Sequence, residues 1–305
     1  MSPLWHLWLV PDTGGNANPT QAPRVRRGHF PCRTTHSEGQ ITCQMMSMPL
    51  FTPANDPGSN FAELVRRVGL QPSHTQWDSA LSVPHATTCL ALRYTDGVLI
   101  AGDRRATSGN WISHRGMEKV VQTDDFSAVA ISGAAGPAME MIKLFALQLE
   151  HYEKMEGRSL SLEGKANQLS MMVRNNLPAA MQGMTVMPLF AGFDTADSVG
   201  RIWDYDATGG RYEEREFVAI GSGQMHAGTV VKVGWKSDLS SNEAIKLACR
   251  ALWEAAEADA ATGGPDSLRG VYPIVAIIDK DGWQRISDDD ISTVFQNIIE
   301  EVKSR

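Results

Sequence analysis

Cysteine is scarce in this sequence, and the four that are present lie far apart. Cys32, Cys43, Cys89 and Cys249 form no CxxC pair and no metal-ligand spacing, which argues against a disulfide scaffold and against a zinc site. Cys89 and Cys249 occur within apolar patterns, so we expect them to be buried thiols. The sequence therefore predicts no metal and no cofactor, and it fits a reducing, cytoplasmic setting.

Long apolar runs and an excess of basic residues are also missing. The apolar stretch from Leu4 to Val10 is short and no basic segment precedes it, so it makes a poor signal peptide. No run approaches the roughly eighteen residues that a membrane helix needs. The net charge of −7 gives no electrostatic footprint for nucleic acid. We therefore expect neither a membrane nor a nucleic acid as a partner.

The amino-terminal part lacks hydrophobic periodicity up to about residue 48 and is rich in Pro, Gly, Thr and Arg. Such a composition favours disorder, and Met45, Met46 and Met48 are alternative start residues. Residues 60–70 differ, because apolar residues recur there at helical spacing after Asn60, a capping residue. This segment is either a marginal helix, unstable alone in water, or a leader helix that docks on a partner during assembly.

From Thr88 onward the hydrophobic pattern switches between strand and helix periods. Strands are predicted over residues 88–94, 98–102, 119–123, 128–132, 189–194, 201–206, 217–220, 271–278 and 283–286. Helices are predicted over about 138–149, 161–181, 223–234, 241–260 and 288–302, with Asp288 as the cap of the last one. This order suits two antiparallel sheets packed face to face with helix pairs outside. The predicted class is therefore α+β.

The stretch from Pro84 to Lys119 holds a candidate nucleophile. A threonine hydroxyl is a poor nucleophile without an adjacent base. If the chain is cut between Ala86 and Thr87, the freed α-amine titrates near roughly 7.7–8.0 and can take the hydroxyl proton of Thr87. Asp103 follows Thr87 by sixteen residues, and Lys119 follows Asp103 by sixteen. These intervals suit a strand, a return strand and one further loop. We therefore expect the Lys119 cation beside the Thr87 hydroxyl, with the Asp103 carboxylate holding the lysine in place.

Taken singly, these residues have ordinary interpretations, because paired threonines favour strands and lone charges are usually solvated. Together they form an ordered set of motifs: Thr87-Thr88, Gly102-Asp103-Arg104-Arg105, Lys119, Ser132-Gly133, Gly221-Ser222-Gly223 and Thr262-Gly263-Gly264-Pro265-Asp266. At these residues, and over nearly everything from Pro84 to about Val302, the chain resembles proteasome β subunits of the actinobacterial type. These are threonine peptidases among the amino-terminal-nucleophile hydrolases.

The resemblance implies a four-layer αββα sandwich and a division into two parts. Residues 1–86 correspond to a propeptide, expected to be largely disordered and removed on maturation, and residues 87–305 to the peptidase domain. Members of the family usually carry Gly just before the threonine, whereas this chain has Ala86. The added Cβ is expected to slow self-cleavage between Ala86 and Thr87.

The resemblance also assigns roles to residues whose ordinary readings are structural. Gly133, which alone reads as a turn or cap residue, corresponds to the donor of an N–H to the oxyanion. Ser222, otherwise an N-cap serine, corresponds to a proton-relay residue beside Thr87. Asp259 and Thr262, otherwise part of a capped helix end, correspond to residues that support Ser222 and the threonine amine. The family often has Ser at the position of Thr262, so the hydroxyl is kept.

A specificity pocket follows from the same comparison. The positions that correspond to its lining are Ala106, Met117, Ile131, Ala135 and Met139, and Thr107 and Ala135 correspond to positions whose backbone pairs with an extended substrate. All five lining side chains are uncharged. Because burying an unpaired charge is costly, we expect the pocket to favour apolar residues before the cut.

The resemblance implies partner proteins as well, and three alternative functions have to be weighed against it. Proteasome β subunits form seven-membered rings between rings of α subunits, and an ATPase acting through the α ring feeds unfolded protein to the inner chamber. A simpler two-ring bacterial peptidase of the same fold is disfavoured by the long leader and by Arg104-Arg105 after Asp103. A non-catalytic ring subunit is disfavoured by the presence of Thr87, Asp103 and Lys119. A small-molecule amidase of the same superfamily remains an alternative.

Overall fold

A computed structural model describes residues 87–304 of the chain. The predicted propeptide, with its alternative start residues and its expected helix over residues 60–70, lies outside the described residues. Ala86, on the amino-terminal side of the predicted cleavage site, also lies outside them.

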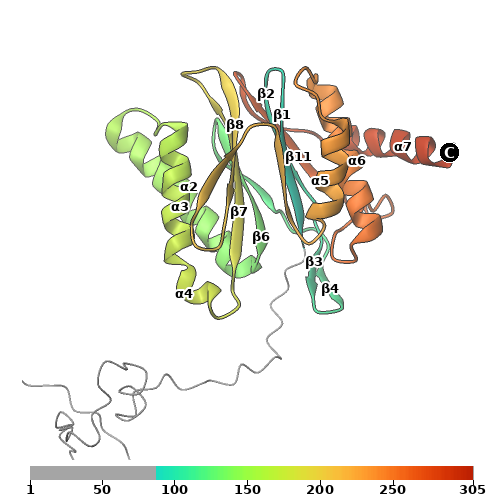
Figure 1. Cartoon of the computed structure of the whole chain (residues 1–305), viewed down its shortest axis with the longest axis horizontal. Helices are drawn as coiled ribbons and strands as arrows, with labels where there is room; N and C mark the ends of the chain where they lie inside the picture. The colour runs from blue at the N-terminus through green and yellow to red at the C-terminus, as the bar shows by residue number, and fades with distance from the viewer. Residues whose placement is uncertain (1–86, 305) are drawn as a thin grey trace, which may run out of the picture. The chain divides into compact units, whose positions relative to one another are not determined.

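Ten of the strands form two antiparallel five-stranded sheets (Figure 1). The first sheet has the order β10-β1-β2-β11-β12. Its strands are β1 (Thr88–Tyr94), β2 (Gly97–Gly102), β10 (Phe217–Gly221), β11 (Ile274–Asp279) and β12 (Gly282–Arg285). The second sheet has the order β5-β6-β7-β8-β9. Its strands are β5 (Val120–Asp124), β6 (Ser127–Gly133), β7 (Val186–Asp194), β8 (Val199–Tyr205) and β9 (Arg211–Glu214).

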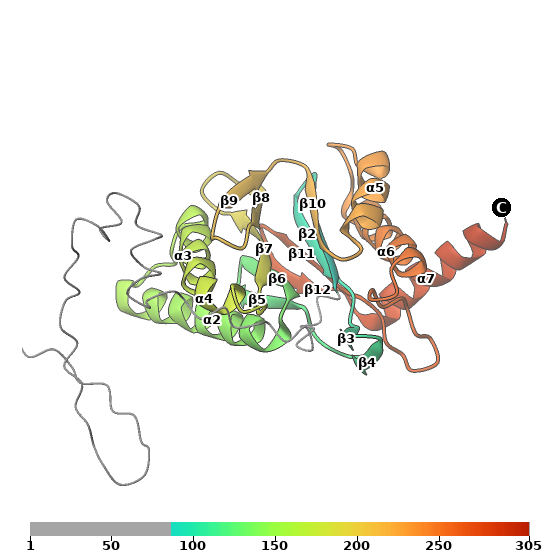
Figure 2. The same ribbon diagram turned by 60° about the horizontal axis from the view of Figure 1, so that its bottom comes forward.

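The helices cover the outer faces of the two sheets, as Figures 1 and 2 show. Beside the second sheet lie α2 (Ala135–Glu156), α3 (Leu162–Asn175) and the short α4 (Leu177–Ala180). Beside the first sheet lie α5 (Gln224–Gly234), α6 (Ser241–Ala258) and α7 (Asp288–Lys303). Helices and antiparallel sheets alternate as the sequence order predicted, so the α+β class is confirmed.

The apolar side chains of β1 explain why both faces of its sheet are covered. Leu90 and Leu92 pack in one cluster with α5, α6 and α7, whereas Cys89 and Ala91 pack in another with strands of the second sheet. Successive side chains of a strand point to opposite faces, so the continuous apolar run from Cys89 to Leu92 must be buried on both faces. A third cluster, which includes Phe145 and other residues of α2 and α3, covers the outer face of the second sheet.

Two predicted elements differ in detail. The helix predicted over residues 161–181 breaks at Asn176, because Pro178 has no N–H to continue the helical hydrogen bonds, and a separate turn of helix, α4, follows. The cap of α7 is Ser287, whose side chain accepts a hydrogen bond from Asp290 N at 3.1 Å, and Asp288 is the first helical residue.

One further hairpin was not predicted from the sequence. Strands β3 (Ala106–Ser108) and β4 (Trp111–His114) pair with each other as a separate two-stranded ribbon. All four residues of β4 are exposed, and the apolar Trp111 and Ile112 are adjacent to each other, so the pattern lacks the apolar alternation from which a half-buried strand is recognised. It forms part of the loop between β2 and β5, and so it lies between Asp103 and Lys119 in the chain.

Candidate active site

The two sheets together bring the three predicted reaction residues to one place in the fold. Thr87 directly precedes β1, Asp103 directly follows β2, and Lys119 directly precedes β5. Because β1 and β2 are antiparallel neighbours, the start of one lies beside the end of the other. Thr88 N donates to the Asp103 Oδ1 atom at 2.9 Å, and Asp103 N donates to the Thr88 carbonyl at 3.1 Å. The predicted convergence is therefore present between the ends of β1 and β2.

The Asp103 carboxylate is buried and accepts four hydrogen bonds. Its Oδ1 atom accepts from Lys119 Nζ at 2.7 Å and from Thr88 N, while its Oδ2 atom accepts from Arg105 N at 2.9 Å and from Gly263 N at 2.8 Å. The side chains of Asp103 and Lys119 are 0% and 1% exposed, so the ion pair is shielded from water. The carboxylate therefore fixes the position of the lysine ammonium group.

Gly133 ends β6 directly before the amino terminus of α2. Its φ of +99° is one that residues with a side chain rarely adopt. A Cβ at this position would lie 2.2 Å from the Thr185 carbonyl oxygen, so no larger residue fits unless β7 or the residue directly before it moves. Gly133 is thus held at the strand-to-helix junction where the sequence places the oxyanion donor.

A second group of polar residues lies on the other side of Thr87. Ser222 N donates to the Thr87 carbonyl at 2.8 Å, and the Ser222 hydroxyl donates to Asp259 Oδ2 at 2.5 Å. The Thr262 hydroxyl donates to the same oxygen at 2.6 Å. Burial acts to raise the pKa of Asp259, but these two hydroxyls and the N–H of Ala261 more than offset it and hold the pKa below its ordinary value. Asp259 is therefore an ionised acceptor at neutral pH.

One pocket contains both the predicted nucleophile, Thr87, and most of the predicted specificity residues. It is lined by Thr87, Ala106, Thr107, Ser113, Met117, Lys119, Ile131, Ser132, Gly133 and Ala135. Four of the five predicted lining side chains are among these residues. Met139 is not, and it packs instead against the apolar cluster under α2. Ser113 was missed because it lies on the unpredicted strand β4, and no spacing in the sequence indicates that β4 turns toward Thr87.

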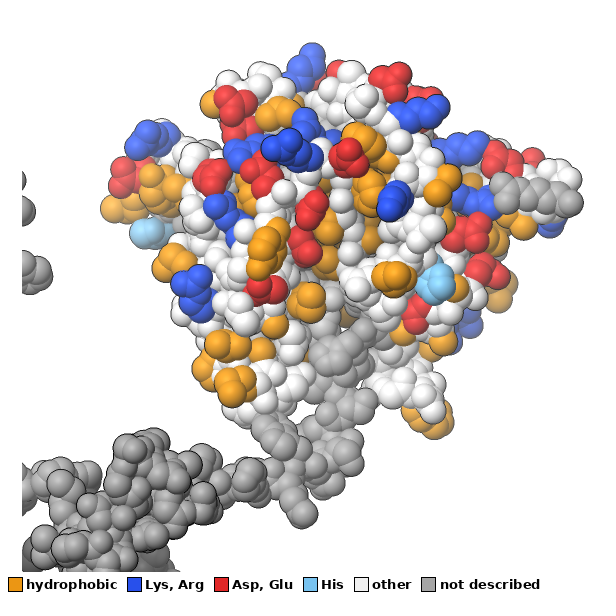
Figure 3. Space-filling model, in the orientation of Figure 1, with side chains coloured by type: hydrophobic (Ala, Val, Ile, Leu, Met, Phe, Trp, Pro, Cys, Tyr) orange, Lys and Arg blue, Asp and Glu red, His pale blue; other side chains and the backbone are white. Residues whose placement is uncertain are grey.

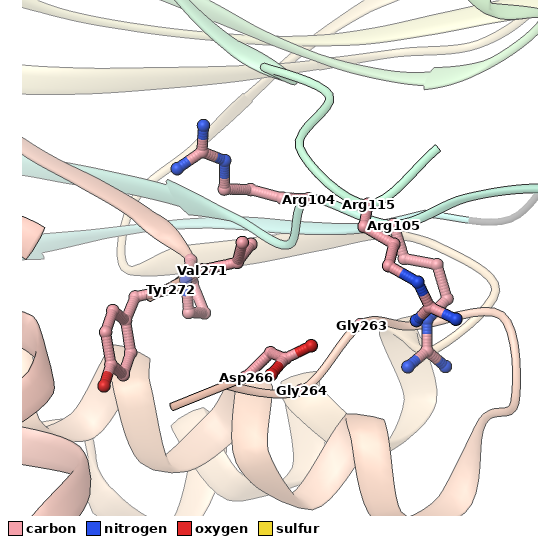
Figure 4. Close-up of a pocket in the computed structure, with 9 residues that line it drawn as sticks. Arg104, Arg105, Arg115, Gly263, Gly264, Asp266, Val271 and Tyr272 are labelled. Atoms are coloured by element: carbon pink, nitrogen blue, oxygen red, sulfur yellow. The ribbon is translucent and has the colours of Figure 1, made fainter. Parts of the chain in front are cut away.

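Three arginines line a separate pocket beyond Gly263 (Figure 4). In that view the side chains of Arg105 and Arg115 extend past Gly263, whereas Arg104 extends away from them. The guanidinium of Arg105 donates to the Ala260 carbonyl at 2.9 Å, and its backbone N–H binds Asp103. Arg105 therefore anchors the 260–263 loop that brings Thr262 and Gly263 to the site. This anchoring role was not predicted.

Comparison with known proteins agrees with this geometry. The family model described as "Proteasome subunit" matches residues 83–269. The chain belongs to the proteasome subunit family. It is 54% identical over 262 residues to the proteasome subunit beta of Acidimicrobium ferrooxidans, covering 85% of this chain and 96% of that one.

Two further β subunits are similar at nearly the same level. Identity is 51% over 221 residues with the subunit of Acidothermus cellulolyticus, covering 71% of this chain and 76% of that one. With Streptomyces griseus subsp. griseus it is 50% over 221 residues, covering 72% and 79%. The expected resemblance to actinobacterial proteasome β subunits is therefore confirmed. Identity at this level over most of the chain supports the function of a catalytic 20S proteasome β subunit, a threonine peptidase that assembles into rings with other subunits.

Proposed function

We propose that this proteasome subunit is made as a zymogen that cuts itself between Ala86 and Thr87 and then hydrolyses peptides with Thr87 as nucleophile. The observation that carries the proposal is that Thr87, Lys119 and Gly133 line one pocket. Nucleophile, tuning cation and oxyanion donor have to meet at one reacting carbonyl, and these three come from the ends of three different strands.

In the proposed mechanism the Thr87 hydroxyl attacks the scissile carbonyl while the free Thr87 amine accepts its proton. The Lys119 cation, fixed by Asp103, favours the developing alkoxide. The Gly133 N–H stabilises the oxyanion of the tetrahedral intermediate. The amine then delivers the proton to the leaving group, and water hydrolyses the acyl-enzyme. Ser222, supported by Asp259 and Thr262, relays protons beside the amine.

The pocket beside Thr87 is proposed to select an apolar residue before the cut. Ala106, Met117, Ile131 and Ala135 line it without contributing a charge, and the ammonium group of Lys119 is already paired with Asp103. A charged substrate side chain would therefore lose its hydration without gaining a partner. Met139, which lies outside this lining, would act only through the helix that carries Ala135. The backbones of Thr107 and Ala135 are proposed to pair with the extended substrate.

The proposed working form is a seven-membered β ring that stacks with rings of α subunits in the cytoplasm, with an ATPase acting through the α ring. The layers of Figure 1 support the four-layer αββα sandwich proposed for each subunit. Exposed apolar side chains on α2 and α3 support lateral packing, because a monomer gains nothing from presenting them to water. Those residues are Leu144, Leu147, Met155 and Met171. Figure 3 also shows apolar side chains gathered around the α4 end of this face.

Intact mass and amino-terminal sequencing, with and without co-expressed α subunit, test the proposal. We expect assembled wild-type protein to lose residues 1–86 and to begin at Thr87. The Thr87→Ala variant should assemble but keep its full length and cleave no peptide. A mature chain that begins at Thr88, or an active Thr87→Ala variant, would overturn the assignment of the nucleophile. Turnover of a small amide but of no peptide would favour an amidase instead.

A further inference from the structure

A line of buried hydrogen bonds runs through the second threonine of the pair, Thr88. Gly223 N donates to the Thr88 Oγ1 atom at 3.1 Å. Thr88 Oγ1 lies 2.5 Å from Thr262 Oγ1, and Thr262 Oγ1 donates to Asp259 Oδ2 at 2.6 Å. Nothing in the mechanism above assigns a role to Thr88, because it does not line the pocket that contains Thr87.

Counting protons fixes the direction of this line. Each hydroxyl has one hydrogen to donate, and Thr262 gives its hydrogen to Asp259, whose lowered pKa keeps it an acceptor. The bond between the two threonines must then be donated by Thr88. The order is therefore Gly223 N–H to Thr88, Thr88 to Thr262, and Thr262 to Asp259, with every donor pointing toward the carboxylate.

The surroundings leave these hydroxyls no alternative arrangement. Thr88 and Thr262 are each 0% exposed. A Cβ on Gly223 would lie 2.3 Å from Thr88 Oγ1 and 2.8 Å from Thr262 Oγ1, so the backbone of the Gly221-Ser222-Gly223 turn rests directly on both oxygens. Because the space is closed, neither hydroxyl can exchange its protein partner for water.

Thr88 also connects the two polar groups that flank Thr87. Its backbone N–H binds Asp103, the partner of Lys119, and its hydroxyl leads to Asp259, the partner of Ser222. We propose that the Thr88 hydroxyl is a positioning residue that fixes the Thr262–Asp259–Ser222 group relative to the adjacent Thr87. This inference rests on the proposed function, since it gives Thr88 a part in the reaction at Thr87.

Aligned hydrogen bonds polarise one another, which gives the proposal a second consequence. A Thr262 hydroxyl that accepts from Thr88 is a stronger donor to Asp259 than one that accepts from nothing. Removing the Thr88 hydroxyl therefore leaves Asp259, which the proposed function places with Ser222 near the Thr87 amine, a stronger base. The ammonium form of that amine is then favoured, so the amine pKa rises.

Kinetics of assembled, processed enzyme carrying Thr88→Val, compared with Thr88→Ser, test the proposal. Valine keeps the shape of threonine and loses the hydroxyl, whereas serine keeps the hydroxyl. We expect Thr88→Val to lower kcat by about ten- to a hundredfold through misplacement of groups at the reacting centre, with KM changed less than about twofold because Thr88 lies outside the pocket. The acidic limb of its pH profile should move upward by about half a unit. Thr88→Ser should restore kcat to within about threefold of wild type.

Thr123→Val is the matched control. Thr123 is also a buried strand threonine, and its hydroxyl bonds to Ser127 at 2.8 Å, but it lies on β5 away from the pocket residues. This variant should show the thermal destabilisation that follows loss of one buried hydroxyl bond, with an unchanged pH profile. Wild-type kcat and pH profile in Thr88→Val would overturn the inference. The inference would also be overturned if Thr88→Val lowered the melting temperature much more than Thr123→Val does and left the acidic limb of the pH profile unchanged. The role of Thr88 would then be purely structural.

The wild-type enzyme separates this inference from the function on which it rests. A covalent peptide electrophile should label the processed wild type at Thr87, as read by peptide mass. If it does not, the assignment of Thr87 fails and the role of Thr88 fails with it. If the wild type is labelled and Thr88→Val behaves as wild type, only the role of Thr88 is wrong.

Discussion

At the scale of single residues, the Asp103–Lys119 pair shows how a buried charge is kept in place. Taking two charges out of water is unfavourable unless they are paired and fully hydrogen-bonded. Here the Asp103 carboxylate has three backbone N–H donors in addition to Lys119. The hydrogen bonds of the pair are thus satisfied by the fold itself, as its proposed role beside Thr87 requires.

Lys119→Ala is expected to abolish both peptidase activity and self-cleavage. Breaking a buried pair usually costs about 3–5 kcal/mol, but the three N–H donors that stay on Asp103 should place the loss near the lower end and leave the protein folded. Lys119→Arg should also be inactive, because the guanidinium is larger and cannot give up a proton. Peptide hydrolysis measures the activity, intact mass measures self-cleavage, and circular dichroism shows whether the protein is folded. A Lys119→Arg enzyme that matures and cleaves normally would contradict this role.

Ile131 is expected to set the depth of the specificity pocket. It lines the pocket and is 3% exposed, and burying a large apolar substrate side chain beside it is worth roughly 1.5–3 kcal/mol. Peptides with Leu, Phe or Tyr before the cut should therefore react about ten- to a hundredfold faster than those with Arg or Glu. Ile131→Gly should raise the rate for the bulkiest residues. A fluorogenic peptide panel measures both, and equal cleavage after Arg or Glu would contradict the assignment of the pocket.

At the scale of elements, the junction between β6 and α2 is the most constrained part of the site. Strand β6 delivers Ile131 and Ser132 to the pocket, and α2 begins two residues after Gly133. The chain changes direction at Gly133 through a positive φ, with its backbone against the Thr185 carbonyl. The geometry of the predicted oxyanion donor therefore depends on a backbone conformation that only glycine adopts easily.

Gly133→Ala is expected to reduce both stability and activity. A residue with a side chain in such a conformation costs about 1–3 kcal/mol, and relieving the 2.2 Å contact with Thr185 must move the N–H away from the oxyanion. Gly136→Ala is the control, because a Cβ there meets nothing within 4 Å and Ala favours the helix by up to about 1 kcal/mol. Thermal unfolding and peptide turnover should separate the two variants. Equal activity in both would remove Gly133 from the mechanism.

At the scale of the whole molecule, paired carboxylates link stability to pH. Hydrogen bonds from Arg211 lower the pKa of Glu163, and hydrogen bonds from Arg201 lower that of Glu213. A carboxylate whose pKa is lower in the folded chain stabilises the fold above its unfolded pKa of about 4. That contribution disappears as the pH falls through the lowered value. Arg201 holds this network together, since it contacts Glu163, Asp194 and Glu213.

We therefore expect the melting temperature of the precursor to fall steeply below about pH 4, with little change from these groups between pH 5 and 7. Arg201→Gln should flatten the fall, because Glu213 loses the main partner that lowers its pKa and Glu163 keeps only Arg211. Burial raises the pKa of Asp204, so this carboxylate destabilises the fold as the pH rises. Because the wild type and the variant both contain Asp204, its effect does not contribute to the difference between them. Thermal unfolding from pH 3 to pH 7 measures the difference. Identical slopes in the two proteins would rule out this linkage.

Burial in the folded molecule also sets the protonation state of the two buried thiols. Burial raises the pKa of Cys89 and of Cys249 to about 12 in each case, so both stay protonated at neutral pH. The sequence predicted their burial from the apolar residues around them, and the structure confirms it.

The sequence by itself determined the class of the fold and most element positions, and it predicted which residues carry the reaction. Strand and helix periods are local properties, and the sixteen-residue intervals from Thr87 to Asp103 and from Asp103 to Lys119 suit a strand and a return strand. Only the tertiary structure decided which backbone groups bind Asp103, and that Ser113 lines the pocket whereas Met139 packs against the apolar cluster under α2. Thr88 is the clearest case, because its hydroxyl meets Thr262 across 174 residues of chain. Such a contact depends on the packing of a strand end, a turn and a helix end against one another, and no local pattern carries that information.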